Sequence, residues 1–428
     1  MMLARWSGWI RNHAGSAGWL ALEQGAHPLL QLVLTPVLLR SLGREPFAVW
    51  VLGITLIGLS QLVSAGAGFA TIKHVSADLG AARPADARQI VRTALTLPLV
   101  GGSLAAGLAV LFAPFLARVF ASMGSAAELV PVLTGCGAGM LINEIDAVCA
   151  SALRGAQRFD LAARAESGCR VLMAGAIAAL AVLGTGVTSL FLTWLALMAV
   201  KAVVKAVTVA RLFGSPMVLL PSFHREPLRR LLRFGMWQWL QAVGTTVFNT
   251  ADQLLVGSLL GATALTRYSV CLQIAQYVHL VPSVLLQVIF PRLSARGAAV
   301  GAARGNEILR AATALALGIA LLLGAGVALL AAPLLGLWVG PAFAAENTGL
   351  LRLLVAAHVV LGANIGGYYV LLATGRAART ALVLLGAGVA QMGTMLLVAP
   401  FGLMAVAASR FTFSLLTATL ARLARYRA

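Results

Sequence analysis

The chain has 428 residues, of which 60% are hydrophobic and 11% are charged. A soluble protein of this length exposes far more polar surface than this composition supplies, so we exclude soluble enzymes and soluble binding domains. The formal net charge of +19 does not indicate nucleic acid as a partner, because no basic run stands apart from the flank of an apolar stretch.

Apolar stretches with the length of a membrane-spanning helix recur along the whole chain. Each has about 18 to 28 residues, enough to cross a hydrocarbon core of roughly 30 Å at about 1.5 Å per residue. The sequence therefore predicts an all-α polytopic membrane protein with about twelve transmembrane helices. The predicted spans are 15–39, 47–70, 94–118, 128–152, 168–186, 188–212, 233–260, 264–290, 308–335, 348–373, 378–398 and 400–421.

The first stretch follows a basic N-terminal segment, as the core of a signal peptide does. Glu23, His27 and Pro28 interrupt it and no small-residue cleavage site stands out, so we expect an uncleaved first span. Counted in order, the even-numbered loops and both termini carry most of the Lys and Arg residues. The odd-numbered loops carry only Arg40, Arg44, Arg118, Arg267 and Arg352. This asymmetry predicts that both termini are cytoplasmic.

A weak internal repeat relates the two halves of the chain. A shift of 218 residues places Gly43 opposite Gly261 and Trp50 opposite Tyr268 without a gap. The repeat predicts two six-helix bundles related by a pseudo-twofold axis along the membrane normal, with a cavity between them. We expect residues 1–212 to form the first bundle, 213–232 a cytoplasmic linker and 233–428 the second bundle.

Several segments in their order along the chain resemble one family of transporters. They are LLRSLGREPFAVWVLGITLIGLSQLVSAGAGFATIKHVSADLG (38–80), SALRGAQRFDLAARAE (151–166), FNTADQLLVGSLLGATALTRYSV (248–270), LWVGPAFAAENTGLLRLL (337–354) and LLATGRAART (371–380). They are similar to segments of Wzx-type polysaccharide flippases, which export O-antigen and capsule repeat units. These flippases share a superfamily with the multidrug and toxic compound extrusion (MATE) exporters and the lipid II flippases.

The resemblance implies a MATE-like, V-shaped bundle in the bacterial inner membrane. It also implies that the chain moves a polyprenyl-pyrophosphate-linked oligosaccharide from the cytoplasmic to the external leaflet. Membrane lipids are the surroundings of such a protein, and polysaccharide polymerase and chain-length machinery are candidate further partners. Room for only twelve spans argues against the fourteen-span lipid II flippases.

One carboxylate, Asp252, lies inside a strongly apolar run. An acid that faces lipid at mid-depth costs about 2.5 to 3.5 kcal/mol on insertion scales, so we expect Asp252 to face the bundle interior or a wet cavity. Asn249 and Gln253 are close enough along the helix to hydrogen-bond it. Two interpretations stay open: an acid that binds a coupling proton or sodium ion, and a structural hydrogen-bond anchor between helices.

Further acids lie in the predicted first and fourth spans. A shift of 220 residues places Asn364 opposite Glu144, so the two bundles would each present a polar group at one depth. Asp146 lies nearer the cytoplasmic end, where we expect it to pair with Arg154 or Arg158. Glu23 and His27 are four residues apart on one helical face, which suits either proton exchange or a polar patch near the cytoplasmic surface.

Intramembrane cations bear most directly on the substrate. Lys201 and Lys205 are four residues apart in the sixth span, and Arg410 lies within the last span. Such cations either face a polar lumen, where they would hold a pyrophosphate, or extend toward the headgroups. We assign Lys201, Lys205 and Arg410, with Asn249 and Asn364, to substrate binding. We assign Asp252, Glu144 and Glu23 to ion coupling.

The function that these observations favour is a flippase that works by alternating access, with cation coupling. A MATE-type, cation-coupled multidrug exporter is the alternative, and Lys201 counts against it. A membrane-bound polymerase or ligase would need a large external loop with catalytic side chains, which the odd-numbered loops are too short to provide. No catalytic set, metal-ligand spacing or phosphate-binding glycine loop stands out, so we expect no enzyme activity, no cofactor and no metal.

Overall fold

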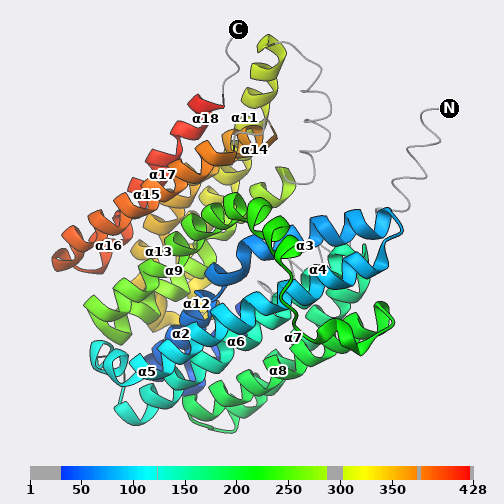
Figure 1. Cartoon of the computed structure of the whole chain (residues 1–428). Helices are drawn as coiled ribbons and strands as arrows, with labels where there is room; N and C mark the ends of the chain where they lie inside the picture. Colours follow the sequence, from blue (N-terminus) through cyan, green and yellow to red (C-terminus); the bar gives the residue numbers. More distant parts are fainter. Residues whose placement is uncertain (1–29, 123, 287–301, 374–376, 425–428) are drawn as a thin grey trace. The chain divides into compact units, whose positions relative to one another are not determined.

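The computed structural model of the protein describes residues 30–122, 124–286, 302–373 and 377–424 (Figure 1). These residues form helices, and no strand occurs among them. The chain divides into two compact units, Met1–Ala242 and Val243–Ala428, which we call the first and second units. The predicted limits of the bundles and the linker stay a prediction.

The first unit is built from helices that the sequence predicts as spans, with short breaks. The predicted span 47–70 is covered by two helices that meet near Ser60, and the span 94–118 by two helices joined through a π-helix. The elements are α2 (Arg44–Gly58), α3 (Gln61–Gly80), α4 (Pro84–Leu97), η1 (Pro98–Gly102), α5 (Ser103–Val119), α6 (Ala126–Gly155), α7 (Phe159–Val182), α8 (Val187–Leu212) and η2 (Pro216–Leu219).

Helix α9 (Arg225–Ala275) begins in the first unit and continues into the second, with a break at Gly261. Breaks also divide the helices over the predicted spans 348–373 and 400–421. The remaining elements are α11 (Ala302–Leu329), α12 (Ala331–Trp338), α13 (Pro341–Gly362), α14 (Ile365–Ala373), α15 (Ala377–Val398), η3 (Ala399–Phe401), α16 (Leu403–Ala408), α17 (Arg410–Thr417) and α18 (Thr419–Leu423).

The lengths and composition of the helices confirm a multi-pass membrane protein. Within the described residues, 8 helices are long and apolar enough to cross a membrane, and the shorter apolar helices Leu30–Leu42 and Leu403–Thr417 accompany them. Side chains on the long helices are exposed although they are apolar, for example Leu111 at 70% and Leu322 at 75%. Such surfaces are stable only where lipid replaces water.

The backbone repeats the same unusual conformation at equivalent places in the two units. Gly43 has φ 83° and ψ −179° where one helix gives way to α2, and Gly261 has φ 82° and ψ −176° at the break in α9. These are the two glycines that the sequence shift of 218 residues aligns. The same shift relates Gly184 (φ 79°) to Gly402 (φ 87°). Positive φ is accessible to glycine at little cost, so the repeat is visible in the backbone as well as in the sequence.

The segment that follows α8 is packed on the first unit. Leu231 and Val218 are buried in an apolar core with residues of α3, α4 and α6. Arg92 donates from Nε to the carbonyl oxygen of Leu220 at 2.9 Å, and the backbone N–H of Ser222 donates to the carbonyl oxygen of Arg92 at 3.3 Å. This segment is therefore held as part of the first unit.

Helices α3 and α9 approach each other backbone to backbone. A Cβ atom added to Gly235 would lie 2.7 Å from the carbonyl oxygen of Gly66, which is closer than real Cβ atoms come to backbone. Only glycine fits at this crossing. The first turns of α9 are therefore fixed against α3 by the core around Leu231 and by the Gly66–Gly235 crossing.

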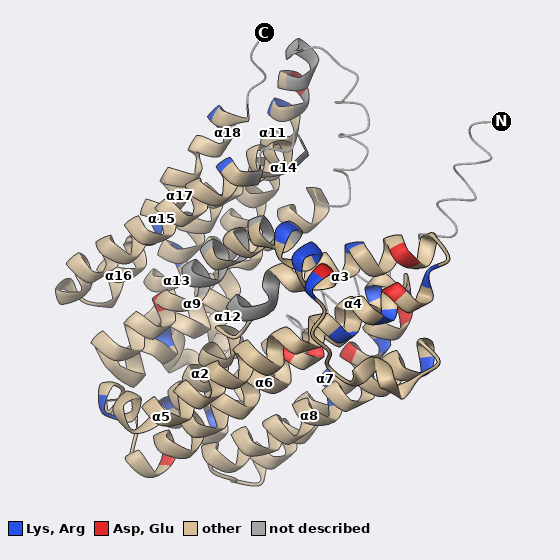
Figure 2. Ribbon diagram, viewed as in Figure 1, with Lys and Arg blue, Asp and Glu red and all other residues tan. Residues whose placement is uncertain are grey.

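Charged residues are distributed unevenly over the first unit. Figure 2 shows many of its Lys and Arg residues around α3, α4 and the start of α9, whereas long stretches of α5 and α8 carry no charge. Acidic residues also appear inside the helical layer, in α6 and α7. Because charges within apolar spans are expensive, these interior positions are the candidates for function.

Candidate functional site

Two buried clusters of charged side chains lie within the apolar helices, one in each unit. The lysine cluster belongs to the first unit and consists of Asp146 from α6, Glu166 and Arg170 from α7, and Lys201 and Lys205 from α8. The spacing of four residues places both lysines on the same face of α8. Three successive spans thus supply its members.

The lysine cluster is held by short ion pairs. Lys201 Nζ lies 3.1 Å from Glu166 Oε1 and 3.2 Å from Asp146 Oδ2. Lys205 Nζ donates to Asp146 Oδ2 at 2.8 Å and also to Glu166 Oε2. Arg170 Nε lies 2.6 Å from Glu166 Oε1. Each lysine therefore bridges the same two carboxylates.

The lysine cluster contains more positively than negatively charged side chains. Three cationic side chains meet two carboxylates, which leaves one positive charge in excess. Lys205 is 1% exposed and Glu166 is 4% exposed, so neither is stabilised by bulk water. Asp146 Oδ1 accepts no hydrogen bond from the described residues. The cluster thus has both an excess cation and an unused acceptor.

The arginine cluster belongs to the second unit and joins α9, α13 and α17. Arg410 is 2% exposed and its Nε donates to Asp252 Oδ2 at 3.1 Å and to the hydroxyl of Tyr268 at 2.8 Å. Arg410 Nη2 also donates to Asp252 Oδ2. Its Nη1 lies 3.2 Å from Nε2 of His358. The guanidinium is therefore surrounded by three partners.

Asp252 uses both of its oxygens in this cluster. The Tyr268 hydroxyl donates to Oδ2 at 2.7 Å, and the backbone N–H of Gln253 donates to Oδ1 at 2.7 Å. Tyr268 and Asp252 lie on opposite sides of the break at Gly261. Their hydrogen bond ties the two limbs of α9 together. A buried charge pair with these additional bonds is the arrangement in which an intramembrane acid is tolerated.

Asn364 contacts α17, the helix that also carries Arg410 of the arginine cluster. Its Nδ2 donates to the carbonyl oxygen of Ser414 at 2.9 Å and to Oγ1 of Thr417. Asn364 stands at the break between α13 and α14 and is 4% exposed. Its Oδ1 accepts no hydrogen bond from any described residue. The side chain thus links two helices and keeps one acceptor available.

Glu144 is fully buried at 0% exposure, on a different face of α6 from Asp146. A Cβ atom added to Gly102 would lie 3.9 Å from the Cβ atom of Glu144. Gly102 is the last residue of the π-helix η1. Single-turn π-helices occur frequently at functional sites because they interrupt the regular hydrogen-bond pattern. Glu144 therefore lies beside a distorted turn.

The structure brings together several of the residues that the sequence singles out. Lys201 and Lys205 share one cluster, and Asp252 and Arg410, assigned to different roles, form one ion pair. Glu23 lies outside the described residues, and so does the side chain of Asn249. The roles in substrate binding and ion coupling stay predictions.

One expected pairing is wrong. Asp146 does not pair with Arg154 or Arg158 but with Lys201 and Lys205. Arg158 instead pairs with Asp160, at 2.9 Å. The side chain of Asp146 leaves α6 on the face that packs against α8, and the distance from the cytoplasmic end did not indicate that direction.

Four members of the clusters were missed by reasoning from the sequence. They are Glu166, Arg170, Tyr268 and His358. A signal was present for the first two, because an acid and a base four residues apart on a helix form a favourable pair. Tyr268 and His358 lie within the predicted spans 264–290 and 348–373, where a polar aromatic side chain needs a partner.

Solved structures of transporters share the fold. An inward-facing multidrug resistance MATE family transporter of the MOP superfamily is 17% identical, with 94% of each chain covered and a TM-score of 0.72. An outward-facing MATE family transporter is 19% identical, with 95% of this chain and 92% of that chain covered and a TM-score of 0.62. These similarities show a MATE-like fold, as the resemblance implied.

A third solved structure differs in its binding pocket. It is a MOP superfamily transporter from Pyrococcus furiosus, 16% identical, with 95% of this chain and 92% of that chain covered and a TM-score of 0.55. It is described as having a pocket of reverse polarity that suggests a different function. No curated protein matches the sequence. Residues 37–345 match the model of a family described as "Polysaccharide biosynthesis protein".

Proposed function

The chain belongs to the polysaccharide biosynthesis protein family, and on that premise we propose that it is a flippase for a lipid-linked oligosaccharide. The substrate would be a polyprenyl-pyrophosphate-linked repeat unit, moved from the cytoplasmic to the external leaflet of the bacterial inner membrane. The MATE-like fold is that of a transporter, and alternating access is the mechanism that two repeated bundles support.

The observation that carries this proposal is the excess positive charge of the lysine cluster. Lys201 and Lys205 lie inside α8, where a cation is expensive unless it is paired or meets an anionic ligand. Asp146 and Glu166 pair with both lysines, and Arg170, whose side chain is 28% exposed, adds a third cation to these two carboxylates. A pyrophosphate supplies compact acceptors of the same sign as the carboxylates. A carrier of cationic drugs would gain nothing from such a cluster.

The geometry suggests that the lysines can share their donors between the carboxylates and a substrate. Asp146 and Glu166 hold the two lysine ammonium groups in the absence of substrate. Each ammonium group has three N–H donors, so a lysine can donate to an incoming pyrophosphate while it still donates to Asp146 or Glu166. The substrate would then bind without leaving a lysine or a carboxylate unpaired in the buried site.

Cation coupling follows from the same reasoning applied to the arginine cluster. If the substrate draws the Arg410 guanidinium away, Asp252 keeps only the Tyr268 hydroxyl and the Gln253 N–H as partners. A carboxylate in that position gains stability from a proton or a sodium ion. The pair would thus link an anion on Arg410 to a cation on Asp252. Glu144, beside η1, is a second candidate for the cation.

The first experiment measures the leaflet distribution of the lipid-linked oligosaccharide. Host cells with and without the protein are treated with a membrane-impermeant sugar probe. Depletion is expected to leave the oligosaccharide on the cytoplasmic leaflet, and the intact protein to restore it to the external leaflet. An unchanged distribution, together with increased drug sensitivity on depletion, would replace the flippase with the MATE-type multidrug exporter.

The role of Lys201 is tested in the same assay. Lys201→Gln is expected to lower export at least about tenfold with normal abundance in the membrane, because one substrate donor is lost from a buried site. Lys73→Gln removes an exposed lysine of α3 and serves as the matched control. Export of Lys201→Gln at the control level would show that the lysine is structural.

A further inference from the structure

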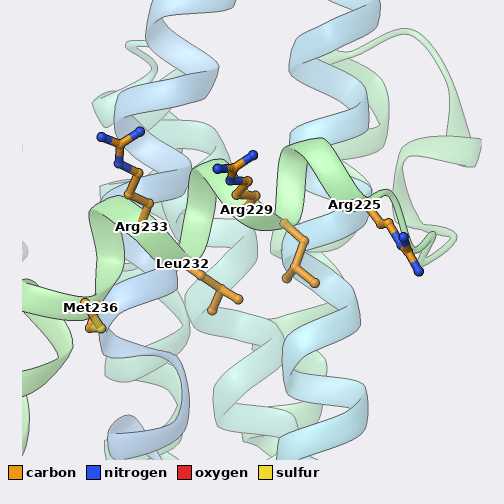
Figure 3. Close-up of a pocket in the computed structure, with 6 residues that line it drawn as sticks. Arg225, Arg229, Leu232, Arg233 and Met236 are labelled. Carbon is orange, nitrogen blue, oxygen red and sulfur yellow. The ribbon is translucent and has the colours of Figure 1, made fainter.

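The first three turns of α9 carry an unusual row of arginines. Arg225, Arg229 and Arg233 are spaced four residues apart. Arg229 and Arg233 point to one side of the helix, whereas Arg225 points away from them at its start (Figure 3). All three side chains are exposed, and no ion pair joins them to any described residue. Glu226, the acid beside them, pairs instead with Arg230, at 3.4 Å. The row therefore holds three positive charges without counter-ions in the described part of the chain.

These arginines line an open cavity of about 440 Å³ together with three apolar residues, Leu228, Leu232 and Met236. Figure 3 shows Arg229 and Arg233 pointing to the same side of the helix, with Leu232 on the other side. Leu232 is 53% exposed and Met236 is 59% exposed. A basic edge beside an apolar edge is typical of a helix that lies in the membrane interface.

The row is held on a rigid base. Leu231 is 1% exposed in the core of the first unit, and His74 Nε2 lies 3.3 Å from the carbonyl oxygen of Arg230. The glycine crossing with α3 fixes the next turn. The arginines are thus presented on a fixed surface, and little ordering of the backbone is needed when a ligand binds.

The positive charge of the arginine row favours some lipid headgroups over others. Arg229 and Arg233 are about 6 Å apart along the helix axis, and Arg225 is about 6 Å further on. A phospholipid with a single negative charge would leave most of this charge uncompensated. A pyrophosphate carries more charge and more acceptor oxygens, and guanidinium groups bind phosphates with two parallel hydrogen bonds.

We propose that Arg229 and Arg233, with Arg225 at the start of α9 adding to the local positive charge, form a capture site for the pyrophosphate of a polyprenyl lipid in the leaflet predicted to be cytoplasmic. The apolar residues Leu228, Leu232 and Met236 contact the first part of the polyprenyl chain. This proposal rests on the proposed function and adds to it a step at the surface that precedes entrance into the transport pathway. The site shares no residue with the lysine cluster.

The test measures lipid binding by the purified full-length protein. The probes are undecaprenyl pyrophosphate, undecaprenyl monophosphate and phosphatidylglycerol, added to nanodiscs of neutral lipid and scored by native mass spectrometry. The variant Arg229→Gln/Arg233→Gln is compared with Arg118→Gln/Arg211→Gln, which removes two other exposed arginines. Arg229→Lys/Arg233→Lys keeps the charge but not the paired hydrogen bonds.

We expect the Arg229→Gln/Arg233→Gln protein to bind the pyrophosphate lipid on the order of tenfold more weakly than the wild type. The affinity of Arg229→Lys/Arg233→Lys should be intermediate, and that of Arg118→Gln/Arg211→Gln should equal the wild-type value. Binding of phosphatidylglycerol should change little. Equal loss for both lipids would show a general membrane anchor and overturn the proposal, as would unchanged binding of the pyrophosphate lipid.

The leaflet assay separates the failure of this proposal from that of the proposed function. Wild-type export together with unchanged lipid binding by the Arg229→Gln/Arg233→Gln variant would reject the capture site alone. An unchanged leaflet distribution on depletion of the wild-type protein would reject the flippase. In that case, a tenfold loss of affinity in the variant that is selective for the pyrophosphate lipid would still establish the binding site, but not a role for it in transport.

Discussion

The pair formed by Asp252 and Arg410 offers a quantitative test of the second unit. Replacing Arg410 with methionine removes every bond that the guanidinium gives to Asp252, Tyr268 and His358. Asp252 is 2% exposed, so water does not replace the lost partner. Breaking a buried pair by removing one member costs about 3 to 5 kcal/mol. In a unit of this size each kcal/mol lowers the melting temperature by about 2 to 4 °C, so we expect a fall on the order of 10 °C.

The double variant Asp252→Asn/Arg410→Met isolates the cause. It removes the charge that Arg410→Met leaves unpaired, and the asparagine can still accept from the Tyr268 hydroxyl. We expect it to recover most of the lost stability, with a coupling energy of about 2 kcal/mol or more. Arg422→Met, an exposed arginine of α18, controls for loss of a cation.

The assay is thermal unfolding of the purified protein in detergent, followed by intrinsic fluorescence at a fixed protein concentration. A melting temperature of Arg410→Met within a degree of the wild type would refute the reasoning, because the pair would then contribute nothing. A double variant as unstable as Arg410→Met would show that loss of packing, and not an unpaired carboxylate, causes the destabilisation.

Three further predictions concern the first unit. Gly235→Ala should lower the free energy of unfolding by about 1 to 3 kcal/mol, because the new Cβ atom would lie 2.7 Å from the backbone of α3. Gly58→Ala should leave it unchanged, because no atom lies within 4 Å of the new Cβ atom. Thermal unfolding of both variants checks this. Gly43→Ala should cost about 1 to 2 kcal/mol through backbone strain at φ 83°, measured in the same way and contradicted by an unchanged melting temperature. Burial lowers the pKa of His74, so its neutral form is favoured on folding and stability should fall as pH drops below about 6.5. His74→Gln should show a smaller loss of melting temperature between pH 7.5 and 5.5 than the wild type, and equal losses would contradict the assignment.

Much of the fold could be predicted from the sequence because its determinants are local. The length and hydropathy of each apolar stretch depend only on consecutive residues, and helices cover the predicted spans in the described part of the chain. The alignment of Gly43 with Gly261 indicated an internal repeat, and both residues have the same positive-φ backbone conformation. The backbone conformation at these positions requires glycine, so the residue type in the sequence indicates it directly.

The breaks within spans were not predicted. The span 47–70 is divided near Ser60, and η1 interrupts the span 94–118 at Pro98. Proline lacks a backbone N–H and disturbs the turn before it, so Pro98 was a signal. Hydropathy averaged over a whole span does not respond to such a local change, because the residues remain apolar on both sides of the break.

The sequence by itself determined that this chain crosses the membrane many times, that its halves repeat and that a few charged residues are placed at high cost within the spans. The tertiary structure alone decided how those charges are paired. Arg410 and Asp252 are 158 positions apart, and Lys205 and Asp146 are 59 apart. Their meeting depends on the rotation of each helix about its axis and on which helices are neighbours. Packing of whole helices fixes both, and no local pattern along the chain records either.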